Sequence, residues 1–195
     1  MMMSKKYIDN ISERCVKRRE INKENNWLKT CSCISVANYI IDQVGERCSR
    51  GEKYPPLSVT RLQKLIFFSD VLYMIEHHGK SIFEPETKFD CIDDEYYLFP
   101  KGPAILSIFN CFSISEAGNV RKWRSDGYYV DDNDAGICDA IDKILRDTAN
   151  IPTCELVEMA RGPWFKERRK DELGRRISKE EIYEYYQKHG VPYGI

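Results

Sequence analysis

The strongest pattern along the chain is a helical one over residues 58–76. Ser58 is a good helix N-cap, and apolar side chains then recur at the three- and four-residue spacing of one helical face. Four further apolar residues widen that face: Phe67, Phe68, Val71 and Met74. A helix that is apolar over so much of its circumference is typical of the middle of a fold. We therefore predict a central helix that closes at Gly79.

Two shorter apolar patterns flank the central helix. Apolar residues at helical spacing over 34–44 predict a helix that Gly45 ends. After the turn-forming residues 100–103, the run 104–112 indicates a short buried helix. Pro103 suits the first position of that helix, because a first-turn residue needs no N–H donor.

The C-terminal part of the chain carries three more helical patterns. Residues 137–145 repeat with a 3.6-residue period, and the polar run 132–134 supplies a cap. A second helix opens at Pro152-Thr153 and ends at Gly162-Pro163. The third follows a capping box formed by Ser178 and Glu181, and Gly190 stops it.

Strand patterns are short and few. Alternating apolar and acidic residues over 80–101 fit either short strands or irregular packing, and 128–130 fits an edge strand. The fold class we predict is therefore mainly α, a single compact helical domain over residues 31–195. Residues 1–30 show weak periodicity and are predicted to form a separate N-terminal extension.

Charge is distributed unevenly along the 195 residues. The formal net charge is −1, but residues 1–30 carry +4, residues 31–160 carry −8 and residues 161–195 carry +3. Near-neutrality argues against a chain-wide basic nucleic-acid binder and against a disordered chain. The favoured interpretation of the basic ends is solvated helical surface, and the alternative is a field that steers a partner to one face. No apolar run approaches the roughly 20 residues that a bilayer requires, so no membrane partner is expected.

The eight cysteines point to free thiols rather than to a disulfide framework. No apolar signal segment follows the N-terminus, so a reducing, cytoplasmic location is expected. Zinc sites built on paired C-x₂-C knuckles are absent, since the chain offers Cys31-Ser32-Cys33 and then Cys48. Small buried hydrophobes are the favoured role of the thiols, with three cysteines around a metal as the alternative. No metal and no cofactor is predicted.

No motif of a known catalytic or nucleotide-binding site occurs. The phosphate-binding loop, the dinucleotide fingerprint, the nucleophile elbow and the zinc-protease helix are all missing. A Cys–His nucleophile pair has little specificity among eight cysteines and three histidines. The acidic clusters 93–95 and 131–134 are candidate cation ligands, and helix capping explains the second better. The sequence therefore favours a protein that is not an enzyme.

Aromatic residues supply the remaining hint, because Tyr and Trp beside arginine are concentrated at interface hot spots. Trp123 lies in the basic run 121–124 on a predicted loop, which makes it a candidate for partner binding. Trp164 follows Arg161-Gly162-Pro163, and the favoured interpretation of its role is core packing behind the preceding helix.

Four short motifs follow one another in a recognisable order. They are Leu62-Gln63-Lys64-Leu65, Gly79-Lys80-Ser81-Ile82-Phe83, Lys101-Gly102-Pro103-Ala104 and Gly162-Pro163-Trp164. Together with the preceding helix, this order resembles the Panacea domain family, which includes SocA-type antitoxins and phage-associated GepA-like proteins. The resemblance covers roughly residues 33–189. One departure is the segment 93–100, which is acidic and aromatic where the family has an Ala-Trp approach to its Gly-Pro turn.

The resemblance implies a mainly helical domain that neutralises a cognate protein toxin by direct binding. In the SocA branch it implies an adaptor that delivers the toxin to an ATP-dependent protease. The candidate partner-binding residues are Gln63, Lys64, Gly102, Pro103, Trp123 and Trp164. Two alternatives are a nucleic-acid-associated regulator of a mobile element and an unrecognised metal or cysteine enzyme.

Lys64 is the most unusual of these candidates, because it lies on the central helix where the apolar arc leaves little room for an ammonium group. One expectation is that its side chain reaches the surface. The other is that it pairs with a carboxylate, either for structural reasons, which we favour, or within a functional groove.

Overall fold

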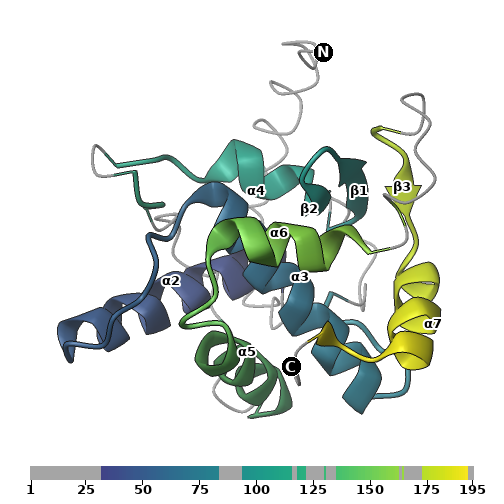
Figure 1. Cartoon of the computed structure of the whole chain (residues 1–195), viewed down its shortest axis with the longest axis horizontal. Coiled ribbons are helices and arrows are strands. Elements are labelled where there is room, and N and C mark those ends of the chain that lie inside the picture. The colour runs from purple at the N-terminus through teal and green to yellow at the C-terminus, as the bar shows by residue number, and fades with distance from the viewer. Residues whose placement is uncertain are drawn as a thin grey trace, which may run out of the picture.

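A computed structural model describes residues 32–83, 94–115, 118–121, 130, 135–162, 164 and 173–192. These residues form six helices and a small three-stranded sheet around one hydrophobic core, which confirms the mainly helical fold (Figure 1). The elements, in chain order, are α2 (Cys33–Ser49), α3 (Val59–Glu76), β1 (Tyr96–Phe99), β2 (Gly102–Ile105), α4 (Leu106–Cys111), α5 (Ala135–Asp147), α6 (Thr153–Arg161), β3 (Arg176–Ile177) and α7 (Lys179–His189). The predicted N-terminal extension 1–30 lies outside the described residues, as do 128–129 of the predicted edge strand.

The central helix is confirmed as α3. The side chain of Ser58 accepts a hydrogen bond from the Arg61 N–H at 3.2 Å, as expected of an N-cap. Helices α2, α5, α6 and α7 and the strand β2 all pack against α3, which runs through the middle of the molecule (Figure 1). Leu65 and Phe67, on different sides of the helix, are both fully buried, because neighbours surround it.

The sheet runs in the order β2-β1-β3, and both pairings are antiparallel. A two-residue turn at 100–101 joins β1 to β2, with Phe99 opposite Gly102. The predicted helix start at Pro103 is wrong, because Gly102–Ile105 is a strand and α4 begins at Leu106. A short apolar run fits a buried strand and a buried helix equally well, and Pro103 fits this strand because β2 is an edge strand.

The observed helix ends test the predicted stop signals. Gly45 does not end α2, which continues to Ser49, so that prediction is wrong. Gly45 keeps helical geometry at the modest cost of a glycine in a helix interior, and Gly51, at φ 85°, makes the turn instead. The predicted start of α6 after Pro152 and its end before Gly162 are confirmed.

The other two predicted C-terminal helices are also present. The cap of α7 is confirmed, since the Ser178 side chain accepts a hydrogen bond from the Glu181 N–H at 3.0 Å. Helix α5 covers the predicted range 137–145, and its expected cap at 132–134 lies outside the described residues.

A buried carboxylate fixes the sheet against α3. Asp70 accepts hydrogen bonds from the Ser81 hydroxyl and the Ile82 N–H, both at 2.8 Å, and from the Tyr96 hydroxyl at 3.1 Å. Burial raises the pKa of the Asp70 carboxyl, although these bonds oppose the shift. Tyr96 begins β1, so Asp70 sets where the first strand lies on the central helix.

A buried guanidinium fixes the other side of α3. Arg61 donates to the carbonyl oxygens of Thr148 at 2.8 Å and Ile151 at 2.7 Å. Its guanidinium also lies 5.0 Å from the centre of the Tyr54 ring. These contacts attach the start of α3 to the segment between α5 and α6, which holds α6 beside β2.

Candidate functional site

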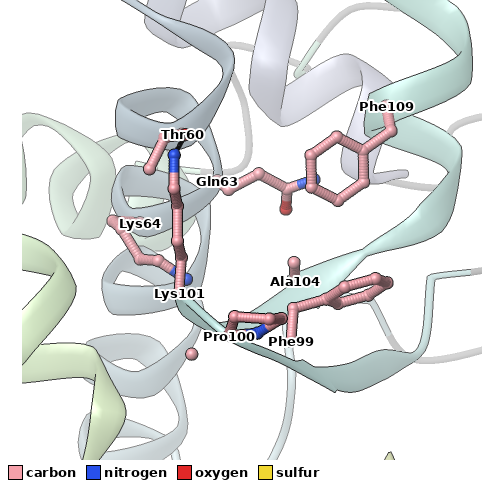
Figure 2. Close-up of a pocket in the computed structure, with 9 residues that line it drawn as sticks. Thr60, Gln63, Lys64, Phe99, Pro100, Lys101, Ala104 and Phe109 are labelled. Atoms are coloured by element: carbon pink, nitrogen blue, oxygen red, sulfur yellow. Dashed lines mark hydrogen bonds between the residues drawn. The ribbon is translucent and has the colours of Figure 1, made fainter. Parts of the chain in front are cut away.

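One pocket lies where four neighbouring elements meet, beside the first half of α3. It has a volume of about 260 Å³ and lies among α3, the β1–β2 turn, β2 and α4 (Figure 2). Nine residues line it: Thr60, Gln63, Lys64, Phe99, Pro100, Lys101, Gly102, Ala104 and Phe109. Three of the six predicted partner-binding residues are among them, and a fourth, Pro103, accepts a hydrogen bond from Lys64.

The Gln63 side chain makes the hydrogen bonds that a neighbouring strand would make along the outer edge of β2. Its side-chain amide donates to the Ile105 carbonyl at 2.8 Å, and its side-chain oxygen accepts from the Ile105 N–H at 3.0 Å. An edge strand leaves such backbone groups unpaired, and a buried unpaired group is costly. The helix thereby satisfies both groups of one residue and fixes the distance between α3 and β2.

Lys64 continues the same arrangement one residue along α3. Alternate residues of a strand direct their backbone groups to the same edge, so Pro103 faces α3 as Ile105 does. Pro103 has no N–H, and its carbonyl accepts a hydrogen bond from the Lys64 amine at 2.6 Å. The two residues of the Gln63-Lys64 motif therefore bind the two residues of β2 that need partners.

The environment of Lys64 differs from both of our expectations. The side chain is 1% exposed, so it does not reach the surface, and among the described residues its amine bonds a carbonyl rather than a carboxylate. The pKa of Lys64 falls to about 7, chiefly because the amine is buried and in addition because the charges of Arg161 and Lys101 are nearby. An amine that carries its extra proton in about half of the molecules at pH 7 is therefore buried in the pocket wall beside two cations.

Gly102 is required where the strand approaches both α6 and Lys64. Its φ is +86°, a conformation that favours glycine, and a Cβ there would lie 3.3 Å from the Ala160 carbonyl oxygen. The same Cβ would lie 3.4 Å from the Lys64 amine nitrogen. The Gly102-Pro103 motif is thus explained by close packing at the floor of the pocket.

The rim of the pocket is basic. The Lys101 amine lies 3.4 Å from the Thr60 hydroxyl, and Lys101 is exposed. Arg161 of α6 donates to the Pro100 carbonyl at 3.0 Å and forms an ion pair with Glu158. Among the described lining residues, two are basic and none is acidic.

Two aromatic rings form the apolar side of the pocket. The Phe99 and Phe109 ring centres are 5.6 Å apart, and Phe109 is 47% exposed (Figure 2). Sequence reasoning missed both residues. Helix α4 is only six residues long and rich in apolar residues, so its pattern does not mark Phe109 as the side chain that faces solvent.

The two predicted tryptophan sites have different outcomes. Trp164 is 7% exposed, packs edge-on to Phe67 and donates from its indole N–H to Glu181 at 3.0 Å. It lies in the core, which confirms the favoured interpretation, and it does not line the pocket. Trp123 lies outside the described residues.

The acidic and thiol groups that we considered as metal ligands have other roles where the structure describes them. Asp94 accepts from the Cys33 N–H at the start of α2, and Glu95 forms an ion pair with Arg176. The described part of the chain contains no group of three His, Cys, Asp or Glu side chains placed to hold a metal. Its cysteines, Cys33, Cys48, Cys111, Cys138 and Cys154, form no disulfides with one another. The acidic run 131–134 lies outside the described residues.

Comparisons with known proteins leave the pocket as the main guide to function. No family model matches this sequence, and searches of curated proteins and of solved structures also gave no match. The resemblance to the Panacea domain therefore stays a prediction that rests on the four motifs. None of the described helices has both the length and the apolar character needed to cross a membrane.

Proposed function

We propose that this chain is an antitoxin-like protein-binding module, which neutralises a cognate protein toxin by direct contact through the pocket and its rim. The observation that carries the proposal is the exposed Phe109 ring beside an apolar cavity with a basic edge. Aromatic anchors that fill pockets dominate the binding energy of protein interfaces, and a polar rim surrounds them. The resemblance to antitoxins supplies the class of partner.

The size and rigidity of the pocket support a protein partner. At about 260 Å³, the cavity is smaller than the roughly 300–1,000 Å³ of small-molecule sites, so it suits one side chain of a partner. Its walls are held in place by the bonds from Gln63 to Ile105 and from Lys64 to Pro103. A site ordered before binding loses less conformational freedom on association, which favours affinity.

Two finer parts of the proposal rest on the sequence. The thiol-rich chain suits a reducing compartment, so we place the protein in the cytoplasm. The resemblance to the SocA branch adds delivery of the bound toxin to an ATP-dependent protease. Delivery predicts that the toxin has a shorter half-life in cells that contain this chain than in cells that lack it.

Co-expression with the product of the adjacent reading frame tests the main proposal. We expect that product alone to stop growth, and this chain to restore growth and to co-purify with it. Phe109→Ala should lose both effects, because it removes the exposed anchor. Leu173→Ala is a matched control, since Leu173 is 46% exposed in the turn before β3, at the opposite edge of the sheet. An adjacent product that is neither toxic nor bound would refute the proposal.

A further inference from the structure

The pocket combines one apolar wall with one cationic wall. Figure 2 shows the Phe99 and Phe109 rings on one side, with Lys64 and Lys101 of the same cavity on the other. Ala104 lies between the rings and the lysines in this view (Figure 2). A ligand that fills this space has an apolar part and, within the same small volume, an anionic part.

The charge around the cavity favours an anion. Lys64 and Lys101 line it and Arg161 lies close enough to act electrostatically on Lys64, while Glu158 pairs with Arg161 outside the lining. An ammonium group has three N–H donors, and among the described residues the Lys64 amine uses one of them on Pro103. Residues 31–160 carry a net charge of −8, so the two lysines of the lining are an exception within an acidic part of the sequence.

Burial makes the charged form of Lys64 unfavourable unless an anion lies beside it. The amine is almost completely buried, and its pKa falls to about 7 because water is excluded and two cations repel it. A carboxylate placed in the cavity offsets both effects, since it attracts the ammonium group and accepts its remaining donors. The pocket is therefore most complementary to a ligand that carries a carboxylate.

We propose that this pocket binds the C-terminal residue of the partner chain, with an apolar side chain packed against the two phenylalanine rings and the terminal carboxylate on the amines of Lys64 and Lys101. This inference rests on the proposed function, because it names the part of the protein partner that enters the site. A C-terminal residue carries its side chain and its carboxylate on one α-carbon. A cavity that holds a single residue can therefore contact both groups at once, whereas an internal acidic segment must bring its carboxylate from a neighbouring residue.

Fluorescence polarisation with synthetic peptides tests the proposal on the full chain. The probe is a fluorescein-labelled, glycine- and serine-rich peptide that ends in leucine with a free carboxylate. Two further peptides are compared with it. One is the same peptide with a C-terminal amide, and the other is an amidated peptide with an internal leucine followed by aspartate. We expect the acid-ended peptide to bind at least about tenfold more tightly than either, as charge-assisted hydrogen bonds require.

Substitutions of the two lysines test whether their amines cause the preference for the acid-ended peptide. Lys64→Met should weaken binding of the acid-ended peptide by about tenfold, and the exposed Lys101→Gln, which does not threaten folding, by about threefold. In both variants the ratio of acid-ended to amide-ended affinity should fall, because only the acid-ended peptide carries the charge that the amines bind. Lys188→Gln on α7, also an exposed lysine, is the control and should leave all affinities unchanged.

Several results would overturn the inference. They are equal binding of the acid and amide peptides, no binding of any peptide, or stronger binding of the internal aspartate peptide. Competition by N-acetyl-leucine as effective as that of the unlabelled peptide would show a site for small carboxylates instead.

If a short tail added to the end of the adjacent gene product leaves its Phe109-dependent binding intact, the inference fails while the proposed function stands. If acid-ended peptides bind and the adjacent product does not, the toxin assignment fails while this site stands.

Discussion

Replacing Lys64 with methionine removes a buried amine from α3 and keeps an unbranched side chain that packs easily. In the folded chain the pKa of Lys64 falls from 10.5 to about 7, chiefly because the amine is buried. The unfolded chain exposes this amine to water and keeps its ordinary pKa. Between the two values the unfolded chain binds more protons than the folded chain, so the free energy of unfolding rises with pH.

The size of this effect follows from the two pKa values. The limiting slope is about 1.4 kcal/mol per pH unit, and it is reached between the folded and unfolded pKa values. At pH 7 about half of the folded molecules carry the proton, so the gain from pH 7 to pH 9 is about 2 kcal/mol. Burial also raises the pKa of Tyr39 and Tyr186, but those shifts affect stability only above the ordinary pKa of tyrosine, outside this window.

Urea denaturation at pH 7, 8 and 9 measures the effect. We expect the free energy of unfolding of the wild-type chain to increase by about 2 kcal/mol more than that of Lys64→Met across this range. Groups common to both chains cancel in that difference. Parallel pH profiles for the two chains would show that Lys64 does not lose its proton in the folded state, and would refute the reasoning about its burial.

Three further substitutions test how the pocket and its supports are built, each by urea denaturation. Gln63→Leu should lower the free energy of unfolding by about 2–4 kcal/mol, because it leaves the buried N–H and carbonyl of Ile105 without partners. Gly102→Ala should lower the free energy of unfolding by more than Gly51→Ala does. Both glycines have φ near +85°, but of the two only Gly102 would place a Cβ against α6. Equal losses of stability in the two variants would contradict the packing argument. Ser178→Ala should cost about 1 kcal/mol by removing the cap of α7, and an unchanged midpoint would contradict the cap.

The helical part of the fold could be predicted because its signals are local. Ser58 and Ser178 cap the helices they precede, and apolar residues recur along the 18 residues of α3. Local signals failed where they have two meanings. Gly45 is compatible with a helix interior as well as a helix end, and four apolar residues at Gly102–Ile105 are too few to distinguish a strand from a helix turn.

The candidate site could be predicted only in part, because its contacts join distant segments. The motifs identified Gln63, Lys64, Gly102 and Pro103, but the bond from Gln63 to Ile105 spans 42 residues and leaves no pattern in either segment. Phe109 was missed because exposure depends on what packs over α4, and neighbouring apolar residues give the same sequence signal whether they are covered or not.

Hydrogen exchange of this chain, alone and in complex with the product of the adjacent reading frame, tests the central claim most directly. The claim is that the partner covers the pocket and its rim. We predict slower exchange in the complex for backbone amides over residues 99–109, with little change along the exposed face of α5. Protection confined to α5 or α7, with unchanged exchange over 99–109, would contradict it.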